Sequence, residues 1–382
     1  MDPIQQDNQH EISIQRLATK IYRDDVRPAL ERARLDVRML LLDMEELPKS
    51  VAGLNKLSAE IKRIVNDVYG AGWLSATEEM TELAAYEAAF YAGLMTKSFG
   101  DAISKPLSVP PDEKIRRYVS AALMSLDGTS PKTAVWAEFV KDNVGSVGDA
   151  YDQQVRAAFV NGETVNQAAK RLKTVTDGIL NSRAENLVRT GVQHYAIQSR
   201  LAMAADNKSV IAREVPVTTF DNRRSLICTG IQDEYGQRGW PAGESPIGYP
   251  PYHYSCRTGV IFLPKGQDSI EGMRAAVSGR KGEQAKEDYE ARDSRTDKKV
   301  KYRGRRDQNI FDTSQIKSST TIESWMRRQP RWYVESALGK ARASLFLNGD
   351  LKLNKFTDAT GRPLTLAELR VVDSEAFERA SL

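Results

Sequence analysis

The chain has 382 residues, of which 41% are hydrophobic and 28% charged, and its net charge is only +4. This length is sufficient for two or three domains with separate cores, and so small a net charge does not by itself indicate a nucleic-acid partner. The most apolar stretch, residues 83–95, is shorter than the roughly 20 residues of a membrane span, and residues 1–15 lack the features of a secretory signal. We expect a soluble protein, and two cysteines are typical of a reducing cytoplasm.

Apolar residues recur at helical spacing through the first 105 residues. The pattern predicts helices over 14–47, 58–69 and 75–97. Pro28 should kink or split the first helix, the glycine-rich residues 70–72 should end the second, and Ser75 is expected to cap the third.

A proline-rich segment at 104–114 indicates an elbow in the chain. Shorter helices are expected after it at about 112–126, 130–143 and 147–160, followed by a helix that Thr164 caps. The most regular helix of this region should span 182–207. His194 lies next to the apolar stripe of that helix, and we expect it at the surface or at the edge of the core.

The pattern changes after residue 210, where alternating β-branched residues predict strands at 209–221 and 257–264. The fold class that follows is mainly α with a small α+β central domain, in which a helix packs on a β-hairpin. We expect an N-terminal helical region (1–110), the central domain (111–265), a charged, basic linker (266–306) and a helical C-terminal tail (307–382). In the tail, Pro330 should separate two short helices and Thr365 should cap the last one.

Residues 279–306 contain 11 basic and 6 acidic side chains and almost no apolar ones. Its basic end is a candidate DNA-contacting tract, made of Lys298, Lys299, Lys301, Arg303, Arg305 and Arg306. The alternative is a solvated linker with no ligand.

His253 and Cys256 lie close together in the sequence, and Cys228 precedes them. Structural zinc takes four ligands, usually Cys or His, so these three residues and Asp221 are weak candidates for a metal site. A catalytic Cys–His pair would need an orienting third group, which is not evident. Buried cysteines beside a turn, or a disulfide between them, are the remaining alternatives. We expect no cofactor, with structural zinc as the alternative.

This region resembles the phage Mu F-like minor head protein family, also called the phage head morphogenesis family. The resemblance covers about 150–265 and 320–370, and its motif residues are Arg189, Thr190, Asp221, Cys228, Pro250, Pro251, His253, Cys256 and Arg257. The chain departs from the family pattern at two positions, where Ser225 and Thr258 stand in place of cysteines. The four-cysteine arrangement of the family is therefore broken here.

The resemblance implies a virion protein at the portal vertex of the head, which assists head assembly, DNA packaging and ejection. Its implied partners are the portal protein, other head proteins and phage DNA, with no membrane during assembly in the host cytoplasm. It implies no enzymatic activity. One alternative is a plain DNA-binding protein that uses the 298–306 tract. A second is an enzyme built on His253, either a small metal-dependent nuclease or a toxin-like transferase.

Overall fold

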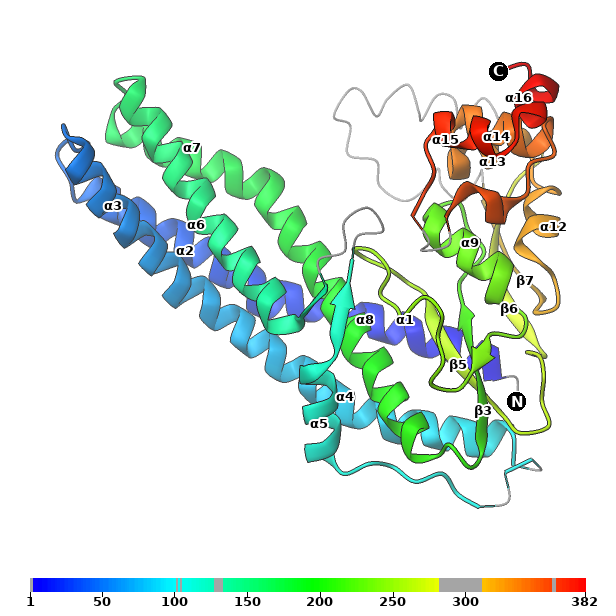
Figure 1. The fold of residues 1–382 in the computed structure, drawn as a ribbon. Coiled ribbons are helices and arrows are strands. Elements are labelled where there is room, and N and C mark those ends of the chain that lie inside the picture. Colours follow the sequence, from blue (N-terminus) through cyan, green and yellow to red (C-terminus); the bar gives the residue numbers. More distant parts are fainter. Residues whose placement is uncertain (1–2, 101, 104, 127–132, 282–310, 359–361) are drawn as a thin grey trace.

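A computed structural model describes residues 3–100, 102–103, 105–126, 133–281, 311–358 and 362–382. The protein is mainly α-helical, with a long helical arm joined to a part that holds three small sheets and the C-terminal helices (Figure 1). Within the ranges described, no helix combines the length and the apolar character needed to cross a membrane.

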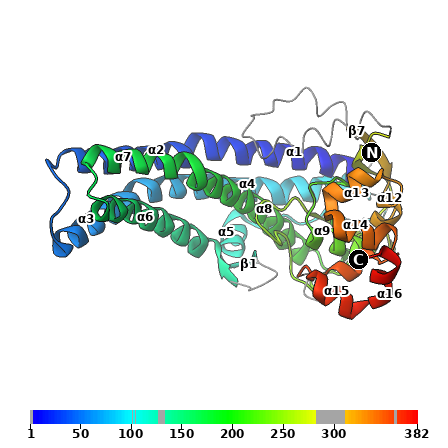
Figure 2. The same ribbon diagram turned by 90° about the horizontal axis from the view of Figure 1, so that it is seen from above.

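Two long helical hairpins lie side by side in the arm (Figures 1 and 2). The first contains α1 (Pro3–Ile21), a π-helical turn (Tyr22–Val26), α2 (Arg27–Leu42), α3 (Val51–Ile64), a second π-helical turn (Val65–Tyr69) and α4 (Gly70–Ser98). The second contains α6 (Trp136–Val160), α7 (Val165–Val175), a third π-helical turn (Thr176–Leu180) and α8 (Asn181–Asp206). As predicted, Thr164 caps α7, and it does so in a capping box.

At the breaks expected in the N-terminal helices, the structure has short π-helical turns and the chain remains helical. Pro28 lies at the start of α2, directly after a π-helical turn, and the helix continues through it. Gly72 does not end a helix either, since it lies inside α4. Its role is steric, because a Cβ there would lie 2.4 Å from Cβ of Ala29 and 2.9 Å from the carbonyl oxygen of Asp25. The glycine allows two helices to pack closely. Ser75 lies inside α4 and donates a hydrogen bond to Asp25 (2.7 Å) instead of capping a helix.

The elbow is also less helical than the sequence predicts. The α5 helix (Asp112–Ala121) is followed by β1 (Leu123–Ser125), which pairs antiparallel with β2 (Thr133–Val135) directly before α6. These strands replace parts of the helices expected over 112–126 and 130–143. The two helices expected from about 130 to 160 are the single helix α6.

A three-stranded antiparallel sheet lies against the base of the arm, in the order β4 (Trp240–Pro241), β3 (Ile211–Val217), β5 (Gly259–Pro264). The two strands predicted from the sequence, β3 and β5, pair directly with each other. The segment between them contains α9 (Leu226–Tyr235).

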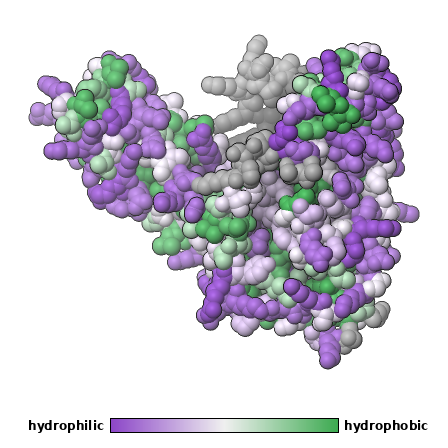
Figure 3. Space-filling view, in the orientation of Figure 1, coloured by the Kyte–Doolittle hydropathy of each residue, from purple (hydrophilic) through white to green (hydrophobic). Residues whose placement is uncertain are grey.

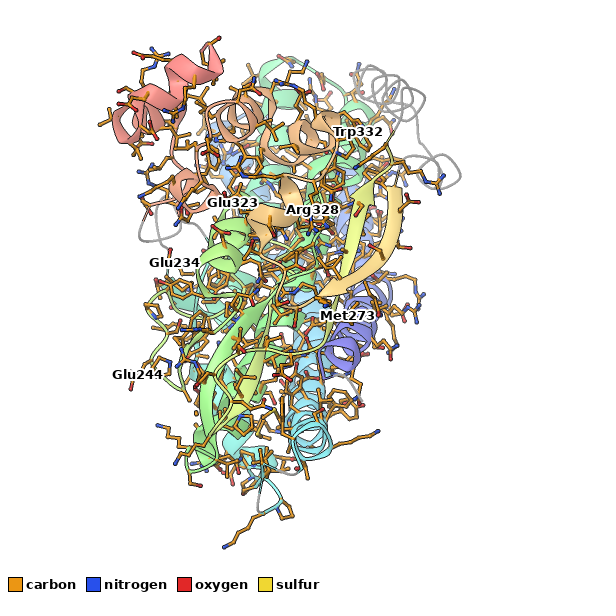
Figure 4. All side chains as sticks on the ribbon, turned by 90° about the vertical axis from the view of Figure 1, so that its right-hand side faces the viewer. Glu234, Glu244, Met273, Glu323, Arg328 and Trp332 are labelled. Carbon is orange, nitrogen blue, oxygen red and sulfur yellow. The ribbon has the colours of Figure 1, made fainter. Side chains whose placement is uncertain are left out.

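The C-terminal part begins with a hairpin of β6 (Met273–Gly279) and β7 (Phe311–Lys317). Its helices are α12 (Ile322–Met326), α13 (Arg331–Leu338), α14 (Lys340–Leu347), a 3-10 turn (Leu353–Phe356), α15 (Leu366–Val372) and α16 (Ser374–Ala380). Pro330 and Thr365 precede helices as expected. In Figure 4, Met273 and Trp332 mark the two ends of the hairpin against which α12 and α13 lie. The pairing of β6 with β7 crosses the expected boundary between residues 306 and 307.

Two main cores hold these parts together. One runs from the arm through α8 to β5, so the regions expected as 1–110 and 111–265 share it. The other lies among the C-terminal helices, and Phe220, which follows β3, inserts into it beside Trp325. The central sheet is therefore joined to both neighbouring regions by buried side chains.

A buried ionic cluster fixes α8 against the first hairpin. The fully buried guanidinium of Arg200 pairs with Glu87 (2.5 Å), Glu11 (2.7 Å) and Asp7 (3.3 Å). It also lies over the ring of Tyr91, whose hydroxyl donates to Asp7. Three carboxylates from α1 and α4 thus meet one cation from α8, and Glu87 also contacts Nε2 of His10 (2.6 Å).

We predict that Arg200→Ala lowers the free energy of unfolding by about 3–5 kcal/mol, because it leaves buried carboxylates without a counter-charge. Glu11→Gln is the matched control, since the Glu11 side chain is the most exposed of the three acidic partners at 16% and should cost less. Denaturant unfolding of both variants tests this. Equal losses would contradict a dominant role for the buried cation.

His194 is fully buried in α8, so its expected place at the surface or core edge is wrong. Burial lowers the pKa of His194 from 6.5 to about 4. The unfolded chain therefore binds a proton near pH 6.5 that the folded protein does not accept until about pH 4. The contribution of neutral His194 to the free energy of unfolding is fully present above about pH 6.5. It is lost as the pH falls from there toward about pH 4.

We predict that His194→Leu flattens this acid dependence. The difference in unfolding free energy between about pH 7.5 and about pH 5 should shrink by roughly 2 kcal/mol relative to the parent protein. Urea titrations of both proteins at the two pH values measure this difference. An unchanged difference would show that another group controls acid stability.

Candidate functional site

The segment that carries His253 and Cys256 is attached to the buried helix α8. The Thr190 hydroxyl accepts a hydrogen bond from the backbone N–H of Ser255 (2.9 Å), and the Asn186 side-chain oxygen accepts one from the Ser255 hydroxyl (3.0 Å). Gln193 donates to the carbonyl oxygen of Thr258 (3.1 Å). These polar residues occur at helical spacing on one face of α8, and together they determine where the segment lies.

Three metal-binding side chains meet beside this segment. Sγ of Cys228 lies 3.2 Å from Nε2 of His253 and 3.7 Å from Sγ of Cys256. All three donor atoms lie within 4.8 Å of one another, both cysteines are buried, and His253 is partly buried. The cluster therefore joins a residue of α9 to two residues of the segment that leads into β5.

Cys228 lies in the first turn of α9, where Ser225 is the N-cap. The Ser225 hydroxyl accepts a hydrogen bond from the backbone N–H of Cys228 (3.1 Å). The Thr258 hydroxyl donates to Sγ of Cys228 (3.1 Å). The two residues that replace cysteines of the family pattern thus both contact Cys228.

The charges in the cluster favour one ionised thiol. Burial opposes ionisation of Cys256, but hydrogen bonds from Cys228 and His253 outweigh it and hold the pKa of Cys256 well below its ordinary value. The hydrogen bond to Cys256, followed by burial, raises the pKa of the Cys228 thiol. His253 Nδ1 bonds the carbonyl oxygen of Tyr254 (2.8 Å), so Nε2 faces the sulfurs. A thiolate on Cys256 is the form that binds soft metals.

Asp221, the fourth candidate ligand from the sequence, lies outside this group of donor atoms. Its carboxylate forms two hydrogen bonds to Arg257 (2.7 and 3.0 Å) and accepts a third from the backbone N–H of Arg223 (3.0 Å). Burial raises the pKa of Asp221, and the bond to Arg257 more than offsets this, so the net shift is downward. Both carboxylate oxygens of Asp221 therefore already accept hydrogen bonds from Arg257.

A small hollow of about 30 Å³ adjoins the cluster. Its lining includes Cys228, His253, Ser225, Thr258, Arg223 and Arg224. Arg224 is buried and donates to the hydroxyls of Thr229 (3.0 Å) and Thr218 (3.2 Å). Burial lowers the pKa of Arg224 to about 10, so it is still a cation at neutral pH and makes the surroundings of the hollow basic.

The remaining sequence candidates are separate from the cluster. Arg189 of the motif pairs with Glu185 within α8 (2.8 Å). The candidate DNA-contacting residues Lys298, Lys299, Lys301, Arg303, Arg305 and Arg306 lie outside the described residues. The described chain leaves β6 at Gly279 and returns in β7 at Phe311, which is the register partner of Gly279.

Sequence analysis missed the anchoring residues Asn186 and Gln193 and the buried cation Arg224. A signal was present, because Asn186, Thr190 and Gln193 recur at helical spacing and polar groups that become buried require partners. Nothing in the sequence indicated which partners they would have.

Comparisons of this chain with protein-family models, with curated proteins and with solved structures give no match. The likeness to phage head proteins therefore rests on the motif residues themselves.

We predict that Thr190→Val loosens the segment, because it removes the acceptor for Ser255 N–H at nearly constant volume. The loss in unfolding free energy should be about 1–3 kcal/mol. The thiols should also react faster with a thiol reagent when a chelator is present, and the readout is simple because the chain has only two cysteines. Thr190→Ser keeps the hydroxyl and is the control. Identical thiol kinetics in all three proteins would contradict the anchoring role.

Proposed function

We propose that this chain is a minor head protein of a tailed bacteriophage, which acts at the portal vertex in head assembly, DNA packaging and ejection. The observation that carries the proposal is the convergence of the motif residues. Thr190 lies beside the segment that holds His253 and Cys256, Cys228 contacts both, and Arg257 of the same segment pairs with Asp221. Residues from distant parts of the chain thus build one site, as a shared family fold would require.

The arm supports a role in assembly. Its sides are polar and carry many ion pairs, such as that between Lys62 and Asp149. Its tip, in contrast, gathers hydrophobic residues (Figure 3), including Val51 at 67% and Val160 at 79% exposure. Val51 begins α3 and Val160 ends α6. The two helices lie side by side near the tip, where Arg156 of α6 donates a hydrogen bond to Asn55 of α3 (3.0 Å). An exposed apolar group at the end of a long arm is typical of a protein contact surface.

In this proposal the chain is a structural component without catalytic activity. A metal-dependent nuclease requires a general base near its metal, and the carboxylate of Asp221 is bound by Arg257. The DNA partner would be contacted through the tract at 298–306, whose basic residues suit phosphate.

We predict that the chain is present at low copy number in purified heads of the phage that encodes it. Quantitative mass spectrometry of these heads measures the copy number. Absence of the chain from heads would overturn the proposal.

We also predict that Val51→Asp combined with Val160→Asp reduces incorporation of the chain into heads at least severalfold without unfolding it. Val371→Asp is the matched control, since Val371 is 89% exposed on α15 and lies away from the arm. If both proteins are incorporated equally, the arm tip is not the contact surface.

A further inference from the structure

We propose that Cys228, Cys256 and His253 bind one Zn²⁺ ion, with a water molecule as the fourth ligand. This inference goes beyond the proposed function, and it stands or falls independently of a role in phage heads. It begins with the donor set. Two thiolates and an imidazole are preferred ligands of zinc, whereas Mg²⁺ and Ca²⁺ require oxygen ligands.

The distances fit a tetrahedral ion. Zinc lies about 2.3 Å from sulfur and about 2.0–2.1 Å from nitrogen, so tetrahedral angles separate two sulfurs by ~3.8 Å and a sulfur and a nitrogen by ~3.6 Å. The sulfurs of Cys228 and Cys256 are 3.7 Å apart, and Cys228 Sγ is 3.2 Å from Nε2 of His253. The remaining pair, Cys256 and His253, lies within 4.8 Å, so an ion can enter if these side chains draw together by at most about 1 Å.

The neighbouring groups hold each ligand in a binding orientation. His253 Nδ1 is hydrogen-bonded to the backbone carbonyl of Tyr254, which directs the lone pair of Nε2 toward the sulfurs. This is the usual outer hydrogen bond of a histidine that binds zinc. The Thr258 hydroxyl donates to Cys228 Sγ, and Ser225 fixes the helical turn that carries this cysteine. Binding thus requires little rearrangement.

The fourth position faces the small hollow beside the cluster. Its volume of about 30 Å³ is enough for about one water molecule. Ser225 and Thr258 line it, and their hydroxyls can hydrogen-bond to that water. Asp221 does not fill this position, because Arg257 holds both of its oxygens.

The test uses the full chain, reduced and freed of metal, with Zn²⁺ alone as the probe. We expect one zinc per chain by elemental analysis and a submicromolar dissociation constant in competition with a chromophoric chelator. Co²⁺ should give the thiolate charge-transfer band and intense visible bands of a tetrahedral site. Both thiols should be protected from a thiol reagent when zinc is bound.

Variants separate this site from chance binding elsewhere. Cys228→Ser, Cys256→Ser and His253→Gln should each weaken zinc binding by at least about 100-fold. Asp221→Asn, the control, should retain one zinc per chain. Should the ligand variants fail to fold, Thr258→Cys provides a test in the opposite direction, since a third thiol beside Cys228 should tighten binding.

Three results would overturn the proposal. The first is that the reduced parent chain does not bind Zn²⁺. The second is that it binds zinc equally well when either cysteine is replaced. The third is that the native pair is a disulfide, detected by intact mass, that forms in preference to zinc binding when both are offered.

Discussion

The buried guanidinium of Arg200 joins three long helices, α1, α4 and α8, at the base of the arm. A guanidinium without solvent contact must be paired, and here its partners come from α1 and α4. The same cluster lies against Gly259, at the start of β5, where a Cβ would be 3.6 Å from the guanidinium. The ionic cluster thus fixes α8 relative to the first hairpin, and it lies beside the strand that follows the cysteine–histidine segment. The same helix holds the segment of the candidate metal site through Thr190 and Gln193.

Every residue of α8 from Thr190 to Ala204 is buried, which explains why one helix has two roles. The polar side chains of this stretch cannot reach bulk water, so each needs a partner inside the protein. Arg200 pairs with carboxylates of α1 and α4. Nearer the start of the helix, Thr190 and Gln193 form hydrogen bonds with backbone groups of the 255–258 segment. The arm and the site are therefore mechanically linked through a single rigid element.

Much of the fold follows from local sequence signals. The α8 helix, the pairing partners β3 and β5, and the caps at Thr164 and Thr365 were predicted because periodicity and capping are local properties. The failures involve distant contacts. Gly72 reads as a helix breaker until Ala29 packs on it, and the β6–β7 hairpin spans a charged stretch with no apolar pattern. Within the site, Cys228, His253 and Cys256 were identified as candidates, but the pairing of Asp221 with Arg257 depends on tertiary structure.

Together, α8 and α9 bring two cysteines and a histidine within reach of one metal ion. The zinc K-edge X-ray absorption spectrum of the zinc-loaded full chain reports the atoms bound to the ion. We expect two sulfurs at about 2.3 Å and two lighter atoms, one an imidazole nitrogen, at about 2.0–2.1 Å. A shell of nitrogen and oxygen alone would contradict this expectation.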